Sequence, residues 1–511
     1  MSAVLAIDQG TSATKAVVVD DHGRLLAEVD QPFEGATYAG DGVEQDPAPL
    51  LASVVAAGRS ALAVAGVPVG AIGLGNQGET VIVWDRRTGE ALSSAISWQD
   101  RRSRIVTTRL ADEQAARVDR VAQLTGLPLD PYFAAPKMTM LAASVVDLMR
   151  TRPDAVITTI DAWVTHQLTG AFVTDAATAS RTMLLDPQRL DWDAEACALF
   201  DVDASRLPRV VACDEQVGLT SAFGGMVPVT GLIVDQQAAL LAQDCRSPGM
   251  AKCTYGTGAF LLSNVGGEHR LSTTGLATSL AWVLRDGTRA SCVDGQVYSV
   301  GAAITWLQRI GLIDEPSDLD RLGLAVPDSG GVSIMPTLAG MGAPVWRPDA
   351  RGSFTGMTLS TTREHLVRAF GEGIAAQVAL LVDAVSREAG ARPAALRVDG
   401  GVTRSRLVMQ AQADLIDAPV EVYPHGCATA LGIAALALRG LAGPGAEESV
   451  VTGWQPVAVY EPSTDRGAAE SIMARARAAV AAHAGGAGIA SAAGAPSDAP
   501  SSTGASRSTD G

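Results

Sequence analysis

One strand–turn–strand pattern occurs twice in this sequence, near the start of each half, and it constrains the fold more than any other feature. The first copy is an apolar run at 4–7, the turn Asp8-Gln-Gly-Thr-Ser12 and a strand from residue 15. In the second copy a strand enters the turn Tyr255-Gly-Thr-Gly258, and a strand at 259–263 leaves it. Glycine and small hydroxyl residues between two apolar runs are typical of tight turns. The repeat predicts two related halves that meet at a cleft.

Hydrophobic periodicity places helices and strands around the two turns. An apolar residue every three or four positions indicates a helix, and a short apolar run bounded by turn residues indicates a buried strand. The sequence thus predicts strands at 15–19, 25–29, 69–74, 80–84, 231–234, 259–263 and 396–398. It predicts helices at 50–65, 103–125, 137–149, 235–242, 300–310, 363–387 and 404–416. Strands and helices mix along the chain, as in an α/β protein.

Composition excludes several classes of function. The 511 residues carry 39 basic and 55 acidic side chains, which gives a net charge of −16 and a pI near 4.8. A surface for nucleic acid or for an anionic membrane is basic, so neither is an expected partner. We find no run of about 18 apolar residues. The N-terminus also lacks a basic stretch before its apolar run, so we expect neither membrane insertion nor a signal peptide.

Cysteine usage and the composition of the last residues give two further predictions. The six cysteines are scattered, and none forms a C-x-x-C pair, which indicates reduced thiols in the cytoplasm. From residue 485 onward the chain is Ala, Gly, Ser, Pro and Thr with almost no large apolar residue. Such a segment buries too little surface to offset its ordering entropy. We therefore predict that 485–511 is a disordered tail.

The first turn has the residues of a phosphate site. Gly10 lets the backbone approach a phosphate, the amides and hydroxyls of Thr11 and Ser12 can point inward, and Lys15 adds positive charge. Asp8 would repel a phosphate, so its expected partner is Mg²⁺, often through water. The alternative is an ordinary hairpin turn.

The second turn, which contains Thr257, strengthens the phosphate interpretation, because two such turns could hold a triphosphate between them. Asp399-Gly400-Gly401 lies ahead of a helix, and paired glycines let a purine lie against the backbone. The alternative there is a plain strand-to-helix turn. Residues 73–78 spell G-x-G-x-x-G, but a strand-like segment follows Gly78 where a dinucleotide site needs a helix. This context argues against a nicotinamide site and a dehydrogenase.

Asp235 lies where a strand ends and a helix begins. In open α/β sheets, functional sites gather at the carboxyl ends of strands, and a carboxylate there can take a proton from a substrate hydroxyl. The alternative is that Asp235 is the N-cap of the helix, a common role for Asp. The local sequence leaves both interpretations open.

Together, these residues and their surroundings resemble the FGGY carbohydrate kinases, and among them most closely the glycerol kinases. The similarity covers 4–440, in order, through IDQGTSATKAVVVD, GVEQDP, GLGNQGETVIVWDRRTGE, AISWQDRR, LTGLPLDPYFAAPK, ASRTMLLD, DQQAAL, PGMAKCTYGTGAF, GMGAPVW and LRVDGG. The resemblance implies two actin-like, ribonuclease H-like α/β domains with an interdomain cleft. The N-terminal domain, 1–246, would bind a polyol and carry the catalytic base, and the C-terminal domain, 247–484, would bind the nucleotide. The implied cofactors are ATP and Mg²⁺.

The resemblance also assigns roles to single residues. It makes Asp235 the catalytic base and Asp8 the Mg²⁺ residue. The positions that match the polyol site are Glu79, Tyr132, Gln236 and, as apolar walls, Trp98 and Phe260. The positions that match the nucleotide site, besides Gly10 and Thr11 of the first turn, are Ser12, Lys15, Thr257, Gly301, Thr305, Gly401 and Ser405. Thr305 and Ser405 stand where glycerol kinases have Gln and Asn.

Gly78 is the most consequential departure from the family pattern. Glycerol kinases have Arg at this position, and that Arg binds a terminal hydroxyl of glycerol. Loss of a charge-assisted hydrogen bond, about 1.5–3 kcal/mol, weakens glycerol binding roughly ten- to a hundredfold unless another group replaces it. Gly78 also leaves room for about one more CH(OH) unit, judged by the reach of an Arg side chain. The alternative is that another side chain fills the gap and glycerol stays the substrate.

We therefore predict a cytoplasmic, ATP-dependent kinase that phosphorylates a primary hydroxyl of a small polyol, as glycerol kinases do. The alternatives are a kinase for a longer polyol, such as erythritol or another tetritol or pentitol, and a kinase for a ketose such as xylulose. An actin-like ATPase or a sugar-binding regulator belongs to a different class and would not need the base Asp235. Family members are often dimers or tetramers, so a homodimer or homotetramer is the assembly to test.

Overall fold

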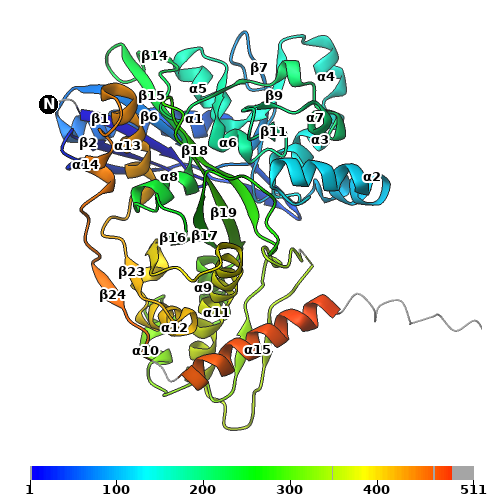
Figure 1. Ribbon diagram of the computed structural model, residues 1–511, viewed down its shortest axis with the longest axis vertical. Helices are drawn as coiled ribbons and strands as arrows, with labels where there is room; N and C mark the ends of the chain where they lie inside the picture. The colour runs from blue at the N-terminus through cyan, green and yellow to red at the C-terminus, as the bar shows by residue number, and fades with distance from the viewer. Residues whose placement is uncertain (1–2, 348, 464–465, 486–511) are drawn as a thin grey trace, which may run out of the picture.

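The structure, a computed structural model, describes residues 3–347, 349–463 and 466–485. It has an upper lobe built mostly from the first half of the chain and a lower lobe built mostly from the second half (Figure 1). Of the predicted tail at 485–511, Gly485 is the last residue of a helix, and residues 486–511 lie outside the described residues, so disorder there stays a prediction.

The upper lobe is organised around a six-stranded sheet in the order β14-β15-β6-β1-β2-β3. β15, β6 and β1 are parallel, and β2 and β3 continue the sheet in antiparallel fashion. β1 and β2 are nearly continuous apolar runs because both faces of the sheet are covered. The bounds are β1 Ala3–Gln9, β2 Ala13–Val19, β3 Leu25–Pro32, β6 Val69–Asn76, β14 Gly218–Thr220 and β15 Val227–Val234.

The lower lobe repeats this arrangement in a seven-stranded sheet, β18-β19-β17-β16-β22-β23-β24. β16, β22 and β23 are parallel, and β17 and β19 continue antiparallel from β16. β16–β17 thus corresponds to β1–β2, so the two halves are related as the repeated turn predicts. The bounds are β16 Ala251–Tyr255, β17 Ala259–Gly266, β18 Ala277–Val283, β19 Arg289–Val297, β22 Leu396–Asp399, β23 Val420–Val422 and β24 Ala458–Tyr460.

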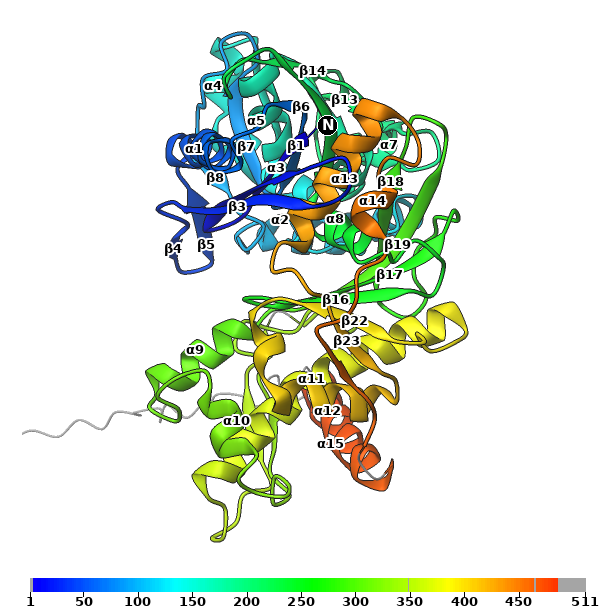
Figure 2. The same ribbon diagram turned by 90° about the vertical axis from the view of Figure 1, so that its left-hand side faces the viewer.

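One helix from the C-terminal half of the chain packs on the upper lobe. α13 (Ala428–Ala442) packs against β1, β6 and β15 and against α8 (Asp235–Ala242), while α1 (Pro47–Ala65) packs against β1, β2 and β3. Figures 1 and 2 both show α13 beside the N-terminal strands. Thr230 Oγ1 donates to Ala437 O at 2.9 Å across this contact. The boundary near residue 246 stays a prediction, and α13 shows that part of 247–484 packs on the upper sheet.

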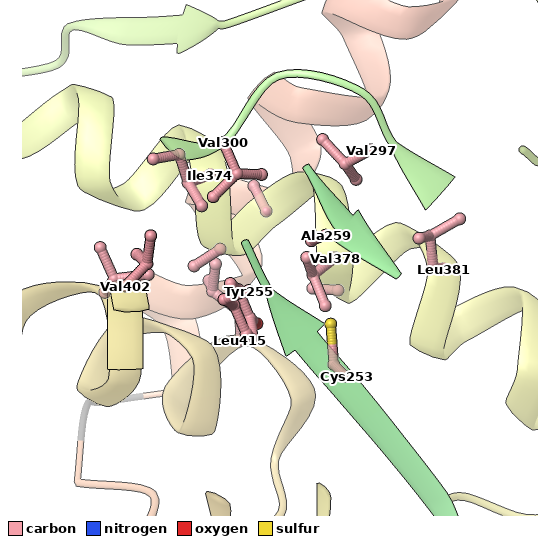
Figure 3. Packing of buried hydrophobic residues seen from close by; sticks show 14 of the residues in the cluster. Cys253, Tyr255, Ala259, Val297, Val300, Ile374, Val378, Leu381, Val402 and Leu415 are labelled. Carbon is pink, nitrogen blue, oxygen red and sulfur yellow. The ribbon is translucent and has the colours of Figure 1, made fainter. Parts of the chain in front are cut away.

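The core of the lower lobe fixes the second turn from both sides. Figure 3 shows Tyr255 and Ala259, which flank the turn, among buried side chains of α11 (Arg363–Ala389) and α12 (Arg406–Ile416). Tyr255 Oη donates to Gln412 Oε1 at 2.7 Å and so satisfies its buried hydroxyl. The turn is therefore held by a packed core, which favours a fixed backbone at this position.

The predicted helix at 137–149 is wrong in its extent. α3 ends at Ser144, Val145 has non-helical angles (φ −122°, ψ 26°), and α4 begins at Val146.

The other helices are α2 Arg104–Thr125, α3 Ala134–Ser144, α4 Val146–Thr151, α5 Ile160–Thr169, α6 Ala176–Ser180, α7 Ala194–Leu199, α9 Gly301–Arg309, α10 Asp318–Gly323, α14 Glu448–Val451 and α15 Arg466–Gly485. The remaining strands are β4 Thr37–Ala39, β5 Gly42–Gln45, β7 Val81–Asp85, β8 Ala95–Ile96, β9 Ala155–Thr159, β10 Val173–Asp175, β11 Leu185–Asp186, β12 Asp191–Trp192, β13 Arg209–Val211, β20 Ser333–Met335 and β21 Ser353–Thr355.

Two helices among the described residues, α1 and α11, are long and apolar enough to cross a membrane by length and composition alone. The most apolar stretch of α11 is 83% buried in the lower lobe, and α1 covers one face of the upper sheet. Core helices of soluble proteins commonly have this composition.

Candidate active site

Two carboxylates meet at the carboxyl ends of the parallel strands of the upper sheet. Asp8 is the penultimate residue of β1, and Asp235 follows β15 as the first residue of α8. α8 contacts β16 and β17 of the lower sheet, so this edge faces the other lobe. The pKa of Asp8 is raised to about 7, first by burial and next by the negative charge of Asp235. The two carboxylates therefore interact electrostatically and belong to one site.

The surroundings of Asp8 fit a bound cation. Its Oδ1 is buried and has no hydrogen-bond partner among the described residues. A buried carboxylate oxygen without a partner is costly unless it is protonated or meets a cation. No group of three or more His, Cys, Asp or Glu side chains in the described part of the chain could hold a metal by itself. A cation here would be shared with substrate phosphates, which is how Mg²⁺ commonly binds in kinases.

The N-cap interpretation of Asp235 is wrong. The N-cap of α8 is Val234, whose backbone is extended (φ −70°, ψ 147°), and Asp235 is the first helical residue. Asp235 Oδ1 accepts a hydrogen bond from Gln236 N at 2.6 Å. Burial raises the pKa of Asp235, and the positive charge of Lys252 opposes that rise.

Lys252 connects the two halves of the site, and the sequence analysis missed it. This fully buried side chain on β16 donates from Nζ to Gln236 Oε1 at 2.6 Å and to Thr254 Oγ1 at 2.9 Å. Thr254 Oγ1 in turn donates to Asp399 Oδ1 at 2.6 Å. The chain of contacts runs from Gln236, beside Asp235, to Asp399, which directly precedes the glycine pair after β22. A lysine within an otherwise apolar strand was the signal available in the sequence.

The second missed group is a buried ion triad around Arg181. Arg181 Nε donates to Glu79 Oε1 at 2.6 Å, and Arg181 Nη1 donates to Asp294 Oδ1 at 2.5 Å. Glu79 belongs to the upper lobe and Asp294 to β19 of the lower sheet, so the triad spans both lobes. Burial raises the pKa of Glu79 and of Asp294, and the Arg181 charge opposes both shifts. Arg181 therefore holds the Glu79 carboxylate in place and favours its ionised form.

Three aromatic side chains that the family pattern assigns to the polyol site contact one another, and their contact with a polyol stays a prediction. Trp98 makes edge contacts with Tyr132 and with Phe260, at centroid distances of 6.0 Å and 5.7 Å. The Arg181 guanidinium lies 5.6 Å from the Tyr132 ring. Trp98 and Tyr132 come from the upper lobe and Phe260 from β17, so this aromatic wall also spans both lobes.

Gly78 directly precedes Glu79 in a strained stretch of backbone. Gly78 and Glu79 both have φ of +46°, a left-handed value that non-glycine residues rarely adopt. A Cβ added at Gly78 would lie 2.9 Å from Val234 Cγ2. The space directly beside Gly78 is therefore occupied by a methyl group of Val234, and a side chain at residue 78 would require a shift.

The two Gly/Thr turns are positioned by contacts on either side of the cleft. In the first turn, Gly10 N donates to Ala13 O, and the Thr11 hydroxyl accepts from Trp98 Nε1 at 2.9 Å, which ties the turn to the aromatic wall. Ser12 is exposed at the tip of the turn.

In the second turn, Thr257 is exposed and its carbonyl oxygen accepts from the amides at the start of α9. Gly301, the first residue of α9, is close enough to the turn that a Cβ would lie 2.6 Å from Gly256 O. Gly401 has open space where a Cβ would point, as a surface for a ligand requires.

Three residues predicted at the nucleotide site have side chains engaged elsewhere. Lys15 lies opposite Asp8 across the β1–β2 pair, but its Nζ binds the carboxylates of β3. The Ser405 hydroxyl donates to Asp320 Oδ1 at 2.6 Å and caps α12, a structural role. Thr305 is exposed on α9, and its hydroxyl donates to Gly301 O at 3.2 Å within the helix. Their contact with a nucleotide stays a prediction.

The two lobes, the carboxylates between them and the paired turns define an actin-like phosphotransferase. The N-terminal domain model of the FGGY family of carbohydrate kinases matches residues 3–242, and the C-terminal domain model matches residues 251–441. The chain belongs to the FGGY family of carbohydrate kinases, and it is a phosphotransferase that acts on an alcohol group. This confirms the family, the two-domain fold and the enzyme class predicted from the sequence.

Curated relatives and solved structures agree with this assignment. The glycerol kinase of Alkalilimnicola ehrlichii is 40% identical over 485 residues, which cover 93% of this chain and 97% of that protein. The glycerol kinase of Aromatoleum aromaticum is 40% identical over 491 residues, with 94% and 98% covered. The structure of Plasmodium falciparum glycerol kinase with ADP is 31% identical, with a TM-score of 0.86 and 94% and 98% of the two chains covered. A xylulose kinase from Lactobacillus acidophilus, 20% identical with a TM-score of 0.86 and coverage of 96% and 99%, shares the fold.

Proposed function

We propose that this protein transfers the γ-phosphoryl group of ATP to a primary hydroxyl of a small polyol. The observation that carries the proposal is Asp235, which begins α8 and interacts electrostatically with the carboxylates of Asp8 and Glu79. A polyol needs hydrogen-bond acceptors along its hydroxyls and an apolar surface along its carbon edge, and the two carboxylates and the three aromatic side chains would offer both.

In the proposed reaction, Asp235 takes the proton of the attacking hydroxyl. The Glu79 carboxylate, held by Arg181, accepts hydrogen bonds from the other hydroxyls, and the Gln236 amide, held by Lys252, donates to them. The two Gly/Thr turns bind the phosphates from the two lobes. Closure of the lobes excludes water and so protects ATP from hydrolysis.

Mg²⁺ is the proposed metal, and Asp8 is the residue that would hold it. Its unpaired, buried Oδ1 is the feature that fits a cation. When bound with ATP, the metal supplies positive charge to the phosphate oxygens and so lowers the barrier to phosphoryl transfer. In this arrangement Gly10, Thr11 and Thr257 would lie beside the phosphates of ATP.

The acceptor is proposed from the relatives and from the surroundings of Gly78. The relatives that are 40% identical are named glycerol kinases, which supports glycerol or a close analogue. The Val234 methyl beside Gly78 fills part of the gap and so supports glycerol as the first candidate, and a longer polyol such as erythritol is the second candidate on the sequence pattern. A ketose such as xylulose is the third candidate on the sequence pattern alone.

The proposed compartment is the cytoplasm, where ATP is abundant and thiols stay reduced. All six cysteines lie in the described part of the chain, and each is buried with a free thiol. A homodimer or homotetramer remains the proposed assembly.

The test is ADP release with glycerol, erythritol, both threitols, the pentitols and xylulose, each with ATP and Mg²⁺. We expect saturable release with at least one polyol and a new phosphomonoester signal in the phosphorus NMR spectrum of the product. ADP release that no acceptor stimulates would contradict the proposal and would favour an ATPase.

A further inference from the structure

Lys252 is a buried cation whose hydrogen bonds reach both lobes. Its side chain is fully buried on β16, and Nζ donates to Gln236 Oε1 at 2.6 Å and to Thr254 Oγ1 at 2.9 Å. Gln236 lies on α8, which packs against α13 and β15 of the upper lobe and also contacts β16 (Figure 2). Burial lowers the pKa of Lys252, and the carboxylates of Asp399 and Asp235 oppose that shift. A buried charge is costly unless polar groups surround it, so the position of Nζ depends on partners in both lobes.

Thr254 extends this contact toward the nucleotide side. Its hydroxyl accepts from Lys252 Nζ and donates to Asp399 Oδ1 at 2.6 Å, and Thr254 is paired with Asp399 in the parallel register of β16 and β22. A hydroxyl has one proton to donate and lone pairs with which to accept, and this geometry uses it in both roles. Loss of the hydroxyl would therefore break the contact between Lys252 and Asp399.

The residues after Asp399 fit closely against the end of β16. Gly400 has φ of +97°, and a Cβ there would lie 2.3 Å from Tyr255 O. Such a close approach of two backbone segments leaves the turn little freedom once Asp399 is fixed. Gly401 has open space where a Cβ would point, and it is a position that the family pattern assigns to the nucleotide. The placement of the Asp399 carboxylate thus bears on the backbone of the proposed nucleotide site.

We infer that Thr254 is a positioning residue through which acceptor binding and nucleotide binding reinforce each other. Lys252 links it to Gln236 on the acceptor side, and Asp399 links it to the glycine pair on the nucleotide side. An acceptor that orders the Gln236 amide also orders the glycine pair, so ATP binds more tightly when the acceptor is bound, and the reverse holds by linkage. Thr254 itself contacts neither substrate in this arrangement. The inference rests on the proposed function.

The test measures, by isothermal titration calorimetry, how strongly a saturating acceptor tightens the binding of a non-hydrolysable ATP analogue with Mg²⁺. The acceptor is the best polyol of the ADP-release panel, and the coupling factor is the analogue Kd without acceptor divided by the Kd with it. The proteins are the natural chain, Thr254→Val, Thr254→Ser and a matched control, Thr278→Val.

Thr278 suits the control because it lies on β18 of the same sheet, and its buried hydroxyl has no hydrogen-bond partner among the described residues. Thermal unfolding checks that each variant is folded. If Thr254→Val is unfolded, Thr254→Ala takes its place.

We expect a coupling factor of about five or more in the natural chain and of less than about two in Thr254→Val. Valine has nearly the shape of threonine, but it neither accepts from Lys252 nor donates to Asp399. The Kd of the analogue alone should change little. Thr254→Ser keeps the hydroxyl and should keep the coupling, as should Thr278→Val. The acceptor Kd, measured with and without the analogue, should give the same factor in each protein, because linkage is reciprocal.

Three results would overturn the inference while the proposed function stands. Equal coupling factors in the natural chain and Thr254→Val would show that the substrates are coupled without this hydroxyl. A factor near one in the natural chain would show that there is no coupling to transmit. An equal loss of analogue affinity with and without acceptor in Thr254→Val would show that the hydroxyl contacts the nucleotide directly. ADP release that no polyol stimulates in the natural chain would instead overturn the proposed function itself, and the inference with it.

Discussion

Replacement of Arg181 by Met should destabilise the protein more than any single change outside its hydrophobic cores. Arg181, Glu79 and Asp294 are 4%, 4% and 6% exposed, and the guanidinium contacts the two carboxylates at 2.6 Å and 2.5 Å. Removal of one partner from a buried ion pair costs about 3–5 kcal/mol, because the remaining charge is left without compensation. Here two carboxylates lose their shared cation, so we expect the upper part of that range.

The loss should depend on pH in a defined direction. Burial raises the pKa of Glu79 and of Asp294, and Arg181 lowers both, so its removal raises both further in the folded protein. A carboxyl whose folded pKa lies above its unfolded value is destabilising at high pH, and that penalty disappears as pH falls toward the unfolded value of about 4. Arg181→Met should therefore be less stable than the natural chain by a wider margin at pH 8 than at pH 5.

The assay is thermal and urea unfolding of the natural chain and the variant at both pH values. A loss of about 4 kcal/mol lowers Tm by roughly 8–16 °C for a domain of 150–250 residues. The triple change Arg181→Met, Glu79→Gln and Asp294→Asn is the control, because it removes all three charges and should recover most of the stability at pH 8. A loss below about 1 kcal/mol, or a loss equal at the two pH values, would refute the reasoning.

Three further predictions concern the nucleotide side. Asp8→Asn should raise the Mg²⁺ concentration for half-maximal ADP release by about 10- to 100-fold, and an unchanged requirement would place the metal elsewhere. Gly301→Ala should raise the KM for ATP by roughly tenfold or more and leave the polyol KM unaltered, because its Cβ would lie 2.6 Å from Gly256 O and displace the turn. Ser405→Ala should cost about 1 kcal/mol of stability through the lost cap of α12 and the lost bond to Asp320. It should change the KM for ATP little, and a large rise would show that the hydroxyl contacts the nucleotide.

Local features of the fold could be predicted from the sequence because they depend on neighbouring residues. The strands before and after both turns, α1 and α11 follow from apolar periodicity, and their predicted bounds lie close to those in the structure. The break between α3 and α4 could not be predicted, because no Gly or Pro marks Val145 and the apolar pattern continues across it. The placement of α13 on the upper sheet also had no local signal, because its contacts, such as Thr230 with Ala437, join residues more than 200 positions apart.

The residues of the candidate site also fall into those that the sequence predicts and those that it does not. Asp8, Asp235 and the two turns stand out because turn chemistry follows apolar strands, and the family pattern supplied Glu79 and the aromatic wall. Arg181 was missed because its role arises from partners far away in the chain, such as Asp294, and Lys252 was missed because its partner Gln236 lies on a different element. A buried cation is recognised only when the carboxylate or amide that it holds is seen beside it.

The measurement that tests the central claim most directly is single-turnover phosphoryl transfer by Asp235→Asn, with the best polyol of the panel saturating. Asn has nearly the same shape as Asp but cannot accept the proton. We predict that the variant stays folded, binds ATP as the natural chain does, and transfers the phosphoryl group at least about 10²-fold more slowly. A folded variant that keeps more than about a tenth of the natural rate would contradict the assignment of Asp235 as the catalytic base.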